Sequence, residues 1–289
     1  MKRILTMCLT VFLMAMSSMS YAADMIQIKG SDTLINLVQR LAEEYMAKNP
    51  GDYIAVTGGG SGTGVAALIN KKCDIANASR LMKDKEITQA SEAGVEVNRI
   101  VVAIDGLSVV VNPDNPITQL SVPEIGGIFR GEIKNWSEVG GSNMPITLYG
   151  RQSNSGTFVF FRDSILEGDY SQNMNRMNGN AQIVEAIKAD KTGIGYVGVG
   201  YVREATLTVL EVASKKGGDY ASPLNTNDVK SGKYPISRPL NQYIDGIPEG
   251  KLKEFIKFEL SAEGQQIVSD EGFFSVPAEY EEFNGKLGL

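Results

Sequence analysis

The chain has 289 residues, 43% of them hydrophobic, with 28 basic and 34 acidic side chains and a formal net charge of −6. This length and composition can bury one large or two medium cores, and the acidic balance argues against nucleic acid and anionic membranes as partners. Histidine is absent, which excludes Ser-His-Asp triads, Cys-His dyads and His-ligated zinc.

Residues 1–22 have the organisation of a cleavable export signal. Lys2 and Arg3 precede an apolar stretch, residues 4–16, that is too short to span a bilayer. Cleavage leaves 28 − 2 = 26 basic against 34 acidic residues, a charge of −8. Cys73 is then the only cysteine and cannot form an intrachain disulfide. We expect a periplasmic or secreted protein.

Strands and helices are predicted to alternate along the mature chain. The expected strands are residues 26–29, 53–57, 73–76, 95–104, 107–111, 146–149, 194–197 and 207–212. The expected helices are residues 34–50, 65–69, 82–93, 122–129, 158–166, 182–189, 252–260 and 262–268. An extended return crossing is expected at 235–244, and residues 272–277 are expected to end the fold before an acidic tail.

This alternation predicts an α/β protein with mostly parallel sheets flanked by helices. The extended segments 107–111 and 235–244 are predicted to cross between two lobes. One lobe would comprise residues 23–106 and 241–289, and the other residues 107–240. Ligands of such sheets lie at the carboxyl ends of strands, against the N-termini of helices.

Three strand-to-helix junctions carry Gly, Ser and Thr, and the first two fall in the first lobe. The first is residues 30–34, Gly-Ser-Asp-Thr-Leu, where Ser31 or Asp32 could simply cap the helix. The second is the glycine loop 58–64. It lacks the Lys of a P-loop, has the wrong spacing for a dinucleotide fingerprint, and is no nucleophile elbow. Two interpretations of this loop remain. Its backbone could approach a ligand closely, or it could be a flexible turn.

The third junction is residues 150–157, Gly-Arg-Gln-Ser-Asn-Ser-Gly-Thr. Free N–H groups at a helix start favour an anion, and the planar fork of Arg151 matches two oxygens of a phosphate-like or carboxylate group. The alternative is that Ser155 only caps its helix while Arg151 pairs with a surface carboxylate. Junctions from both lobes can converge only in the cleft between them, which favours an anion site there.

The chain resembles the PstS-like phosphate-binding components of ABC transporters, a branch of the type II periplasmic binding proteins. The resemblance covers the whole mature chain and is carried, in order, by residues 30–34, 59–64, 74–80, 128–136, 151–157 and 193–197. It implies a two-lobe fold that holds inorganic phosphate in the inter-lobe cleft and delivers it to a membrane ABC permease. We expect a monomer without a metal or cofactor.

The resemblance also implies the ligand-binding residues. The first lobe would supply Thr33, the backbone of Leu34, and Ser61, and the second lobe would supply Arg151, Ser155, Gly156 and Thr157. One position departs from the best-known pattern, because Arg80 stands where an aspartate accepts the proton of hydrogen phosphate. Arg80 is expected near the ligand, where it either binds further oxygens or pairs with Asp32. Asp32 is the candidate substitute acceptor, or else an N-cap of the first helix.

Three alternatives to a phosphate receptor stay open. Because Arg80 replaces the usual aspartate, the ligand could be another oxyanion, such as sulfate, molybdate or tungstate. An acceptor carboxylate would repel a dianion that carries no proton, and this position no longer supplies one. A secreted phosphate-ester hydrolase would use Ser61 or Ser155 as nucleophile, but without histidine only Asp32 or a lysine could act as its base. A surface or matrix protein could also reuse this fold.

Overall fold

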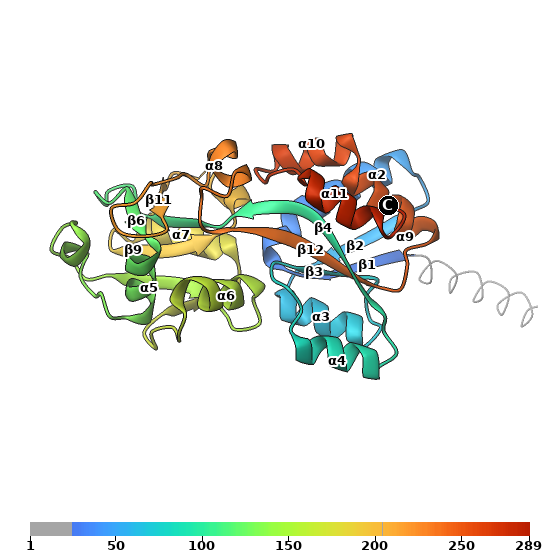
Figure 1. The fold of residues 1–289 in the computed structure, drawn as a ribbon, viewed down its shortest axis with the longest axis horizontal. Helices are drawn as coiled ribbons and strands as arrows, with labels where there is room; N and C mark the ends of the chain where they lie inside the picture. Colours follow the sequence, from blue (N-terminus) through green and yellow to red (C-terminus); the bar gives the residue numbers. More distant parts are fainter. Residues whose placement is uncertain (1–24, 204) are drawn as a thin grey trace, which may run out of the picture.

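The computed structural model describes residues 25–203 and 205–289, so the predicted signal sequence lies outside the described residues. Two α/β lobes lie side by side and are joined by a pair of long strands (Figure 1). No helix in the described ranges is both long and apolar enough to cross a membrane.

The first lobe is built on a five-stranded sheet of order β2-β1-β3-β12-β4. The strands are β1 (Met25–Gly30), β2 (Tyr53–Thr57), β3 (Ile75–Ala78), β4 (Val97–Gly106) and β12 (Ser237–Asp245). The helices are η2 (Asp32–Leu34), α2 (Ile35–Lys48), α3 (Ser61–Ile69), α4 (Asp84–Glu92), α9 (Gly250–Leu260), α10 (Ala262–Asp270) and α11 (Ala278–Gly285). The apolar stripe of α2, with Leu37, Leu41 and Tyr45 buried, faces the core as its spacing predicts.

The second lobe is built on a sheet of order β10-β5-β9-β7-β8. Its strands are β5 (Ser108–Val111), β7 (Thr147–Arg151), β8 (Asn175–Met177), β9 (Gly193–Val197) and β10 (Thr208–Val209), and a small separate sheet joins β6 (Gln119–Ser121) to β11 (Glu211–Ala213). The helical segments are α5 (Val122–Arg130), η3 (Trp136–Val139), α6 (Gly156–Phe161), the π-helix η4 (Arg162–Leu166), α7 (Asn180–Ala189), η5 (Val199–Tyr201) and α8 (Thr226–Lys230).

The predicted α/β class with two lobes built on sheets is confirmed, but the sheets are mixed and not mostly parallel as predicted. The strands that lead into site helices, β1 and β7, pair in parallel with both of their neighbours. The pairings made by β12, β5 and β10 are antiparallel. Antiparallel pairs arise because the chain crosses between the lobes and returns in the opposite direction.

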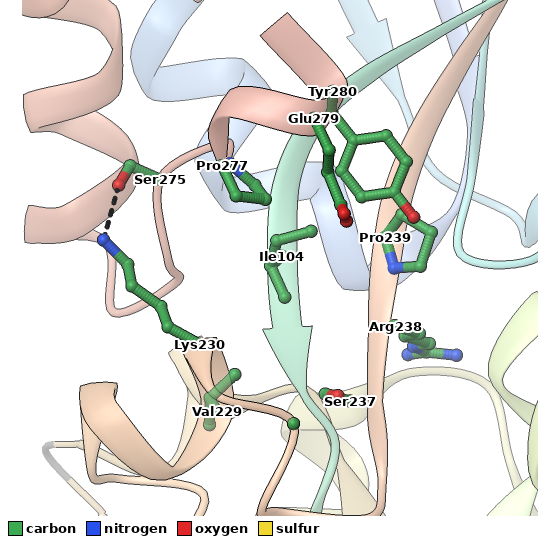
Figure 2. A pocket seen from close by; sticks show the side chains of 11 residues that line it. Ile104, Val229, Lys230, Ser237, Arg238, Pro239, Ser275, Pro277, Glu279 and Tyr280 are labelled. Carbon is green, nitrogen blue, oxygen red and sulfur yellow. Dashed lines mark hydrogen bonds between the residues drawn. The ribbon is translucent and has the colours of Figure 1, made fainter. Parts of the chain in front are cut away.

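The strands that cross between the lobes are β4 and β12, whereas residues 108–111, predicted to be part of a crossing, form β5 within the second sheet. β4 and β12 pair along their whole length, from Ser237 opposite Gly106 to Asp245 opposite Val97. β12 therefore joins the first sheet already at Ser237. The lobe boundaries at residues 106 and 240 stay a proposal. Beside the crossing, Lys230 Nζ donates to Ser275 Oγ at 3.2 Å and ties α8 to the segment before α11 (Figure 2).

The expectation that the fold ends at residues 272–277 is wrong. Phe274 pairs with Ile104 at the edge strand β4, and α11 then packs along that strand. The side chain of Asn284 accepts from Val101 N at 3.0 Å and donates to Val101 O at 2.8 Å. These bonds satisfy backbone groups at the sheet edge, which explains why the acidic tail is ordered as a helix.

Candidate functional site

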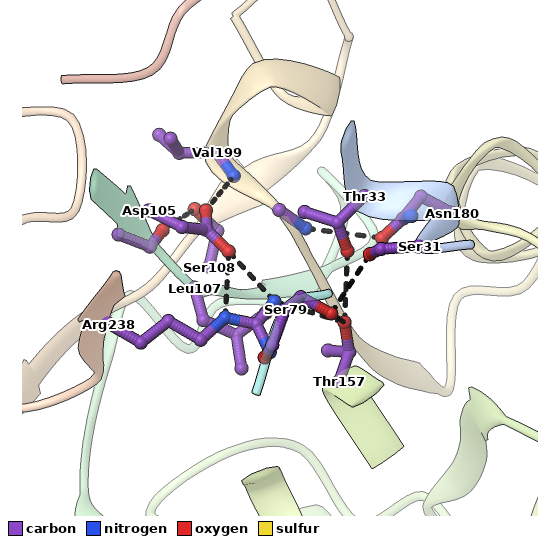
Figure 3. Close-up of polar contacts among 12 residues, drawn as sticks. Ser31, Thr33, Ser79, Asp105, Leu107, Ser108, Thr157, Asn180, Val199 and Arg238 are labelled. Atoms are coloured by element: carbon purple, nitrogen blue, oxygen red, sulfur yellow. Dashed lines mark hydrogen bonds and ion pairs between the residues drawn. The ribbon is translucent and has the colours of Figure 1, made fainter. Parts of the chain in front are cut away.

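Hydroxyl groups from several strand-to-helix junctions converge where the two lobes meet, and Figure 3 shows those of Ser31, Thr33, Ser79 and Thr157. Ser31 Oγ donates to Ser79 Oγ at 3.0 Å, and Ser79 Oγ lies 3.4 Å from both Ser61 Oγ and Thr157 Oγ1. Thr33 Oγ1 lies 3.0 Å from Thr157 Oγ1, across the interface between the lobes. All five residues are at most 3% exposed. We call Ser31, Thr33, Ser61, Ser79 and Thr157 the hydroxyl cluster.

Parallel strands bring these hydroxyls to one place, because their carboxyl ends meet at the same edge of a sheet. β1 leads to Ser31 and Thr33, β2 to Ser61, and β3 to Ser79, while β7 of the other lobe leads to Thr157. A Cβ at Gly156 would lie 2.2 Å from Ser61 Oγ. Glycine is therefore required there for the lobes to approach this closely.

The backbone of the glycine loop also contacts the second lobe. Gly62 N donates to Asn154 O at 3.0 Å, and Asn154 Nδ2 donates to Gly59 O at 2.8 Å. Gly60 has φ of +96°, and a Cβ there would lie 2.7 Å from Asn154 O. The glycines thus allow the backbone of this loop to come close to a neighbour. In the structure that neighbour is Asn154 of the second lobe.

Arg151 and Asp32 form an ion pair between the lobes. Arg151 Nη1 lies 3.2 Å from Asp32 Oδ2, which also accepts from Asn180 N at 2.8 Å and Asn180 Nδ2 at 2.6 Å. Arg151 is 1% exposed, and its Nε and Nη1 have no hydrogen-bond partner among the described residues. Burial lowers the pKa of Arg151, and the Asp32 charge opposes that shift. The buried Nε has neither a hydrogen-bond nor an ion-pair partner among the described residues, and it is the strongest sign of an anion site.

A second buried pair lies directly beneath the hydroxyl cluster. Arg238 Nε and Nη2 donate to Asp105 Oδ2 at 3.1 and 2.8 Å. Arg238 Nη1 donates to Ser79 O at 2.8 Å, and Nη2 to Thr157 Oγ1 at 3.0 Å. Asp105 Oδ1 accepts from Val199 N at 3.0 Å (Figure 3). The pair on the two crossing strands therefore contacts both lobes.

Two tyrosines support the Arg151 loop from behind. Arg151 N donates to Tyr196 Oη at 3.2 Å, and this hydroxyl lies 2.9 Å from Tyr170 Oη, which in turn donates to Phe158 O at 3.0 Å. Burial raises the pKa of Tyr196 to about 12, so the phenol stays protonated. The chain of bonds links β7 to α6 and fixes the distance between Arg151 and the first turn of that helix.

The structure brings together most of the predicted site residues. Thr33, Ser61 and Thr157 belong to the hydroxyl cluster, and Gly156 lies against it. Ser155 Oγ accepts from Phe158 N at 3.4 Å and thus caps α6, while Leu34 N donates to Ser31 O at 3.2 Å within η2. Asp32 does not act as an N-cap, because its carboxylate binds Arg151 and Asn180 in the other lobe.

The suggested pairing of Arg80 with Asp32 is wrong. Arg80 Nη1 and Nη2 donate to the two carboxylate oxygens of Glu86 at 2.7 and 2.6 Å. Burial alone would raise the pKa of Glu86, but the hydrogen bonds from Arg80 and Lys83 lower it. The guanidinium turns to Glu86 because α4, six residues further on, presents a carboxylate in bidentate geometry.

Sequence reasoning missed Ser79, Asp105, Arg238 and Asn180 as members of the site. Ser79 adjoins Arg80 in a quoted motif, and its place at the carboxyl end of β3 was the available signal. Arg238 and Asp105 are charged residues within the two crossing strands. An alternative explanation for such charges is solvent exposure, and only the fold shows that both are buried.

The site is rich in donors and nearly neutral in charge. Arg151 and Arg238 are balanced by Asp32 and Asp105, and the remaining groups are hydroxyls that can donate or accept. Such a site can replace the hydration shell of an anion. Within the described residues, no group of three or more metal-ligating side chains is present.

Two lobes on mixed sheets, linked by crossing strands around a buried donor-rich cluster, define a type II periplasmic binding protein fold. A family model described as "PBP superfamily domain" matches residues 17–263. The phosphate-binding protein PstS of Pseudomonas aeruginosa is 34% identical over 272 residues, covering 88% of this chain and 83% of that protein. PstS of Bacillus subtilis is 33% identical over 261 residues, covering 88% and 82%. The chain therefore belongs to the PBP superfamily and, within it, to the PstS family.

Solved structures are similar over most of the chain. A putative phosphate ABC transporter substrate-binding protein from Clostridium perfringens, with bound phosphate, has a TM-score of 0.78 and 26% identity, covering 88% of this chain and all of that chain. An ABC-type phosphate transport receptor from Vibrio cholerae has a TM-score of 0.71 and 26% identity, covering 87% of this chain and 100% of that chain.

Proposed function

We propose that this chain is an exported receptor that binds inorganic phosphate between its two lobes and delivers it to a membrane ABC permease. The observation that carries the proposal is Arg151, whose buried Nε has no partner among the described residues and whose Nη1 pairs with Asp32, the residue between Ser31 and Thr33 of the hydroxyl cluster. PstS relatives, and a similar structure named for bound phosphate, support phosphate as the anion.

The ligand set that we propose combines the predicted residues with those found in the fold. Phosphate oxygens accept from Arg151, from the hydroxyls of Thr33, Ser61, Ser79 and Thr157, and from the backbone N–H groups of Gly156 and Thr157. Binding exchanges hydroxyl–hydroxyl bonds for stronger bonds to a charged acceptor. Removing a dianion from water is costly unless many donors replace its hydration, and this density of donors meets that need.

Arg80 and Leu34 are not among the direct contacts in this proposal. The terminal nitrogens of Arg80 are bonded to Glu86, and Leu34 N is bonded within its own turn. Arg238 is the proposed replacement for Arg80 as the second cation, because it already reaches Thr157 Oγ1 and lies under the cluster.

Closure and release would occur by a hinge motion at the crossing strands. Contacts between the lobes, such as Thr33 with Thr157, must separate for phosphate to enter. Asp105 and Arg238 lie where β4 and β12 enter the second lobe. In this proposal the protein binds phosphate and transfers it to the permease without a chemical reaction. The relatives are likewise named as binding proteins. Export to the periplasm rests on the sequence of residues 1–22.

A receptor for another oxyanion is the second candidate, and one observation favours it. Both carboxylates near the cluster are already bonded, Asp32 to Arg151 and Asn180, and Asp105 to Arg238 and Val199. A site with no carboxylate free to accept the proton of hydrogen phosphate would accept an aprotic dianion as well.

Calorimetric titration of ligand-stripped residues 23–289 with phosphate and with sulfate, at two pH values, tests the proposal. Strong phosphate binding without a sulfate response supports a phosphate receptor that retains a proton acceptor. Equal binding of both ions would replace it with a general dianion receptor. No heat with either would overturn the anion-receptor function, and turnover of a chromogenic phosphate ester would instead establish an enzyme.

A further inference from the structure

A second cavity, of about 490 Å³, lies between the two lobes. Its walls come from the loop after β3, from β4 and β12, from α6 and η4, and from α11 of the C-terminal segment. Small-molecule sites in proteins typically enclose about 300–1,000 Å³. Of the residues that form the phosphate site proposed above, only Arg238 also lines this cavity.

Arg80 is a buried cation in the wall of this cavity that is only partly satisfied. It is 8% exposed, and its Nε has no hydrogen-bond partner in the described part of the chain, although its terminal nitrogens bind Glu86. A buried N–H group without an acceptor is unfavourable. Arg80 therefore contributes a buried positive charge to the wall of the cavity, although its Nε atom itself has no accessible surface.

Arg99 is a second cation with unused donors. Its Nε donates to Asn241 Oδ1 at 2.8 Å, and its guanidinium lies 5.7 and 5.1 Å from the ring centres of Tyr280 and Phe283. No carboxylate within residues 25–203 and 205–289 forms an ion pair with it. The terminal nitrogens of such a guanidinium form a fork that matches the two oxygens of a carboxylate.

The rest of the lining is cationic and apolar. Lys83 and Arg238 bring the lining cations to four, of which Arg80 and Arg238 are paired with Glu86 and Asp105. The only acidic side chain of the lining, Asp163, pairs with Arg162 at 2.7 Å. Apolar surface comes from Leu81, Val159, Phe160, Pro239 and Tyr280. Arg238, Pro239 and Tyr280 also line a smaller cavity of about 260 Å³ beside the crossing strands (Figure 2).

We propose that the larger cavity binds a small organic anion with a flat apolar body, an aromatic carboxylate being the chemical class that fits. The carboxylate is held by the terminal nitrogens of Arg99, and the ring lies against Phe160 and Leu81. Aromatic and apolar walls with a few placed polar groups are the usual make-up of such sites. The proposal does not depend on which anion the hydroxyl cluster binds.

The test is calorimetric titration of the mature protein with benzoate, in the absence and in the presence of saturating phosphate. Benzoate is expected to bind in both conditions, and neutral benzyl alcohol is expected to bind far more weakly. Leu81→Glu should weaken benzoate binding about tenfold or more, because it places a carboxylate beside the bound one. Leu81 is 56% exposed, so this variant is expected to fold.

Leu224→Glu is the matched control, because Leu224 is 45% exposed and does not line the cavity. Arg99→Gln should weaken benzoate binding in the same way as Leu81→Glu. The proposal is overturned if millimolar benzoate gives no heat, if the two glutamate variants bind benzoate equally well, or if phosphate displaces benzoate. Phosphate titration of each variant reports separately on the hydroxyl cluster, so failure of one proposal is distinguishable from failure of the other.

Discussion

Arg238 Nη2 donates to Thr157 Oγ1 at 3.0 Å, so a side chain of the crossing strand β12 reaches the first turn of α6 in the second lobe. The same guanidinium donates to Ser79 O in the first lobe and is held by Asp105 on the other crossing strand. One fully buried group thus contacts both halves of the hydroxyl cluster from the hinge. This position links the relative placement of the lobes to the geometry of the site.

Arg151→Ala is expected to weaken phosphate binding about 100-fold or more. The variant removes charge-assisted hydrogen bonds worth roughly 1.5–3 kcal/mol and leaves Asp32 without its cation. Calorimetric titration measures the change. Arg40→Ala is the control, since Arg40 forms only an exposed pair with Glu44 on α2. If Arg151→Ala binds phosphate as the wild type does, the site lies elsewhere.

Asp32→Asn separates two roles of the carboxylate. If Asp32 accepts the proton of hydrogen phosphate, this variant should bind phosphate less tightly and sulfate more tightly, because the repulsion of an aprotic dianion is removed. If Asp32 only positions Arg151, both ions should lose affinity by the same factor. Competition titrations of the two anions measure the ratio, and an unchanged ratio would rule out the acceptor role.

Arg238→Met is expected to destabilise the protein by roughly 3–5 kcal/mol, because it leaves Asp105 as an unpaired buried charge. Asp105 is 0% exposed and Arg238 is 3% exposed. The double variant Arg238→Met with Asp105→Leu should recover much of that loss, since no buried charge is left unpaired. Urea unfolding of the three proteins tests this, and a double variant as unstable as the single one would show that the pair's charge is not the cause.

Glu259 on α9 provides a pH-dependent contribution to stability. Gln242 Nε2 donates to Glu259 Oε1 at 2.9 Å, and within the described residues Glu259 Oε2 and Gln242 Oε1 have no partner. A protonated, uncharged carboxyl avoids the cost of burying an unpaired charge at this position. Burial raises the pKa of Glu259 from 4.5 to about 8, against the opposing hydrogen bond from Gln242.

The sign of the effect follows from the raised pKa. The unfolded chain releases this proton near pH 4.5, whereas the folded protein keeps it until about pH 8. Stability from this group is therefore complete below pH 4.5 and is lost as the pH rises to 8, by on the order of a few kcal/mol. Glu259→Gln should flatten this dependence in urea unfolding. Glu254→Gln, an exposed change on the same helix, should leave it intact.

The alternation of strands and helices was readable from the sequence because burial imposes periodicity on neighbouring residues. The apolar stripe of α2 and the buried run of β5 are local patterns of this kind. The helix α11 was missed because its order depends on a remote edge strand: Asn284 bonds to Val101, and no pattern within residues 278–285 records that partner.

The parts of the site that lie within short continuous sequence motifs could be predicted from the sequence. The junctions with Thr33, Ser61 and Thr157 were found because glycine and hydroxyl residues follow each strand directly. The partner of Arg80 was not predicted, since choosing between Asp32 and Glu86 requires distances. Arg238 and Asp105 were missed because a charge in an extended segment gives no sign of whether it is buried.

The sequence by itself determined the elements, the two-lobe class and the three polar junctions, because hydrophobic period and turn chemistry act over a few residues. Only the tertiary structure decided which charges pair, that Arg151 holds Asp32 while Arg80 holds Glu86, and that Arg238 lies beneath the cluster. The physical reason is that an ion pair depends on separation in space and on desolvation. For Arg151 with Asp32, and for Arg238 with Asp105 (|i−j| = 133), both are set by how segments more than one hundred residues apart pack together.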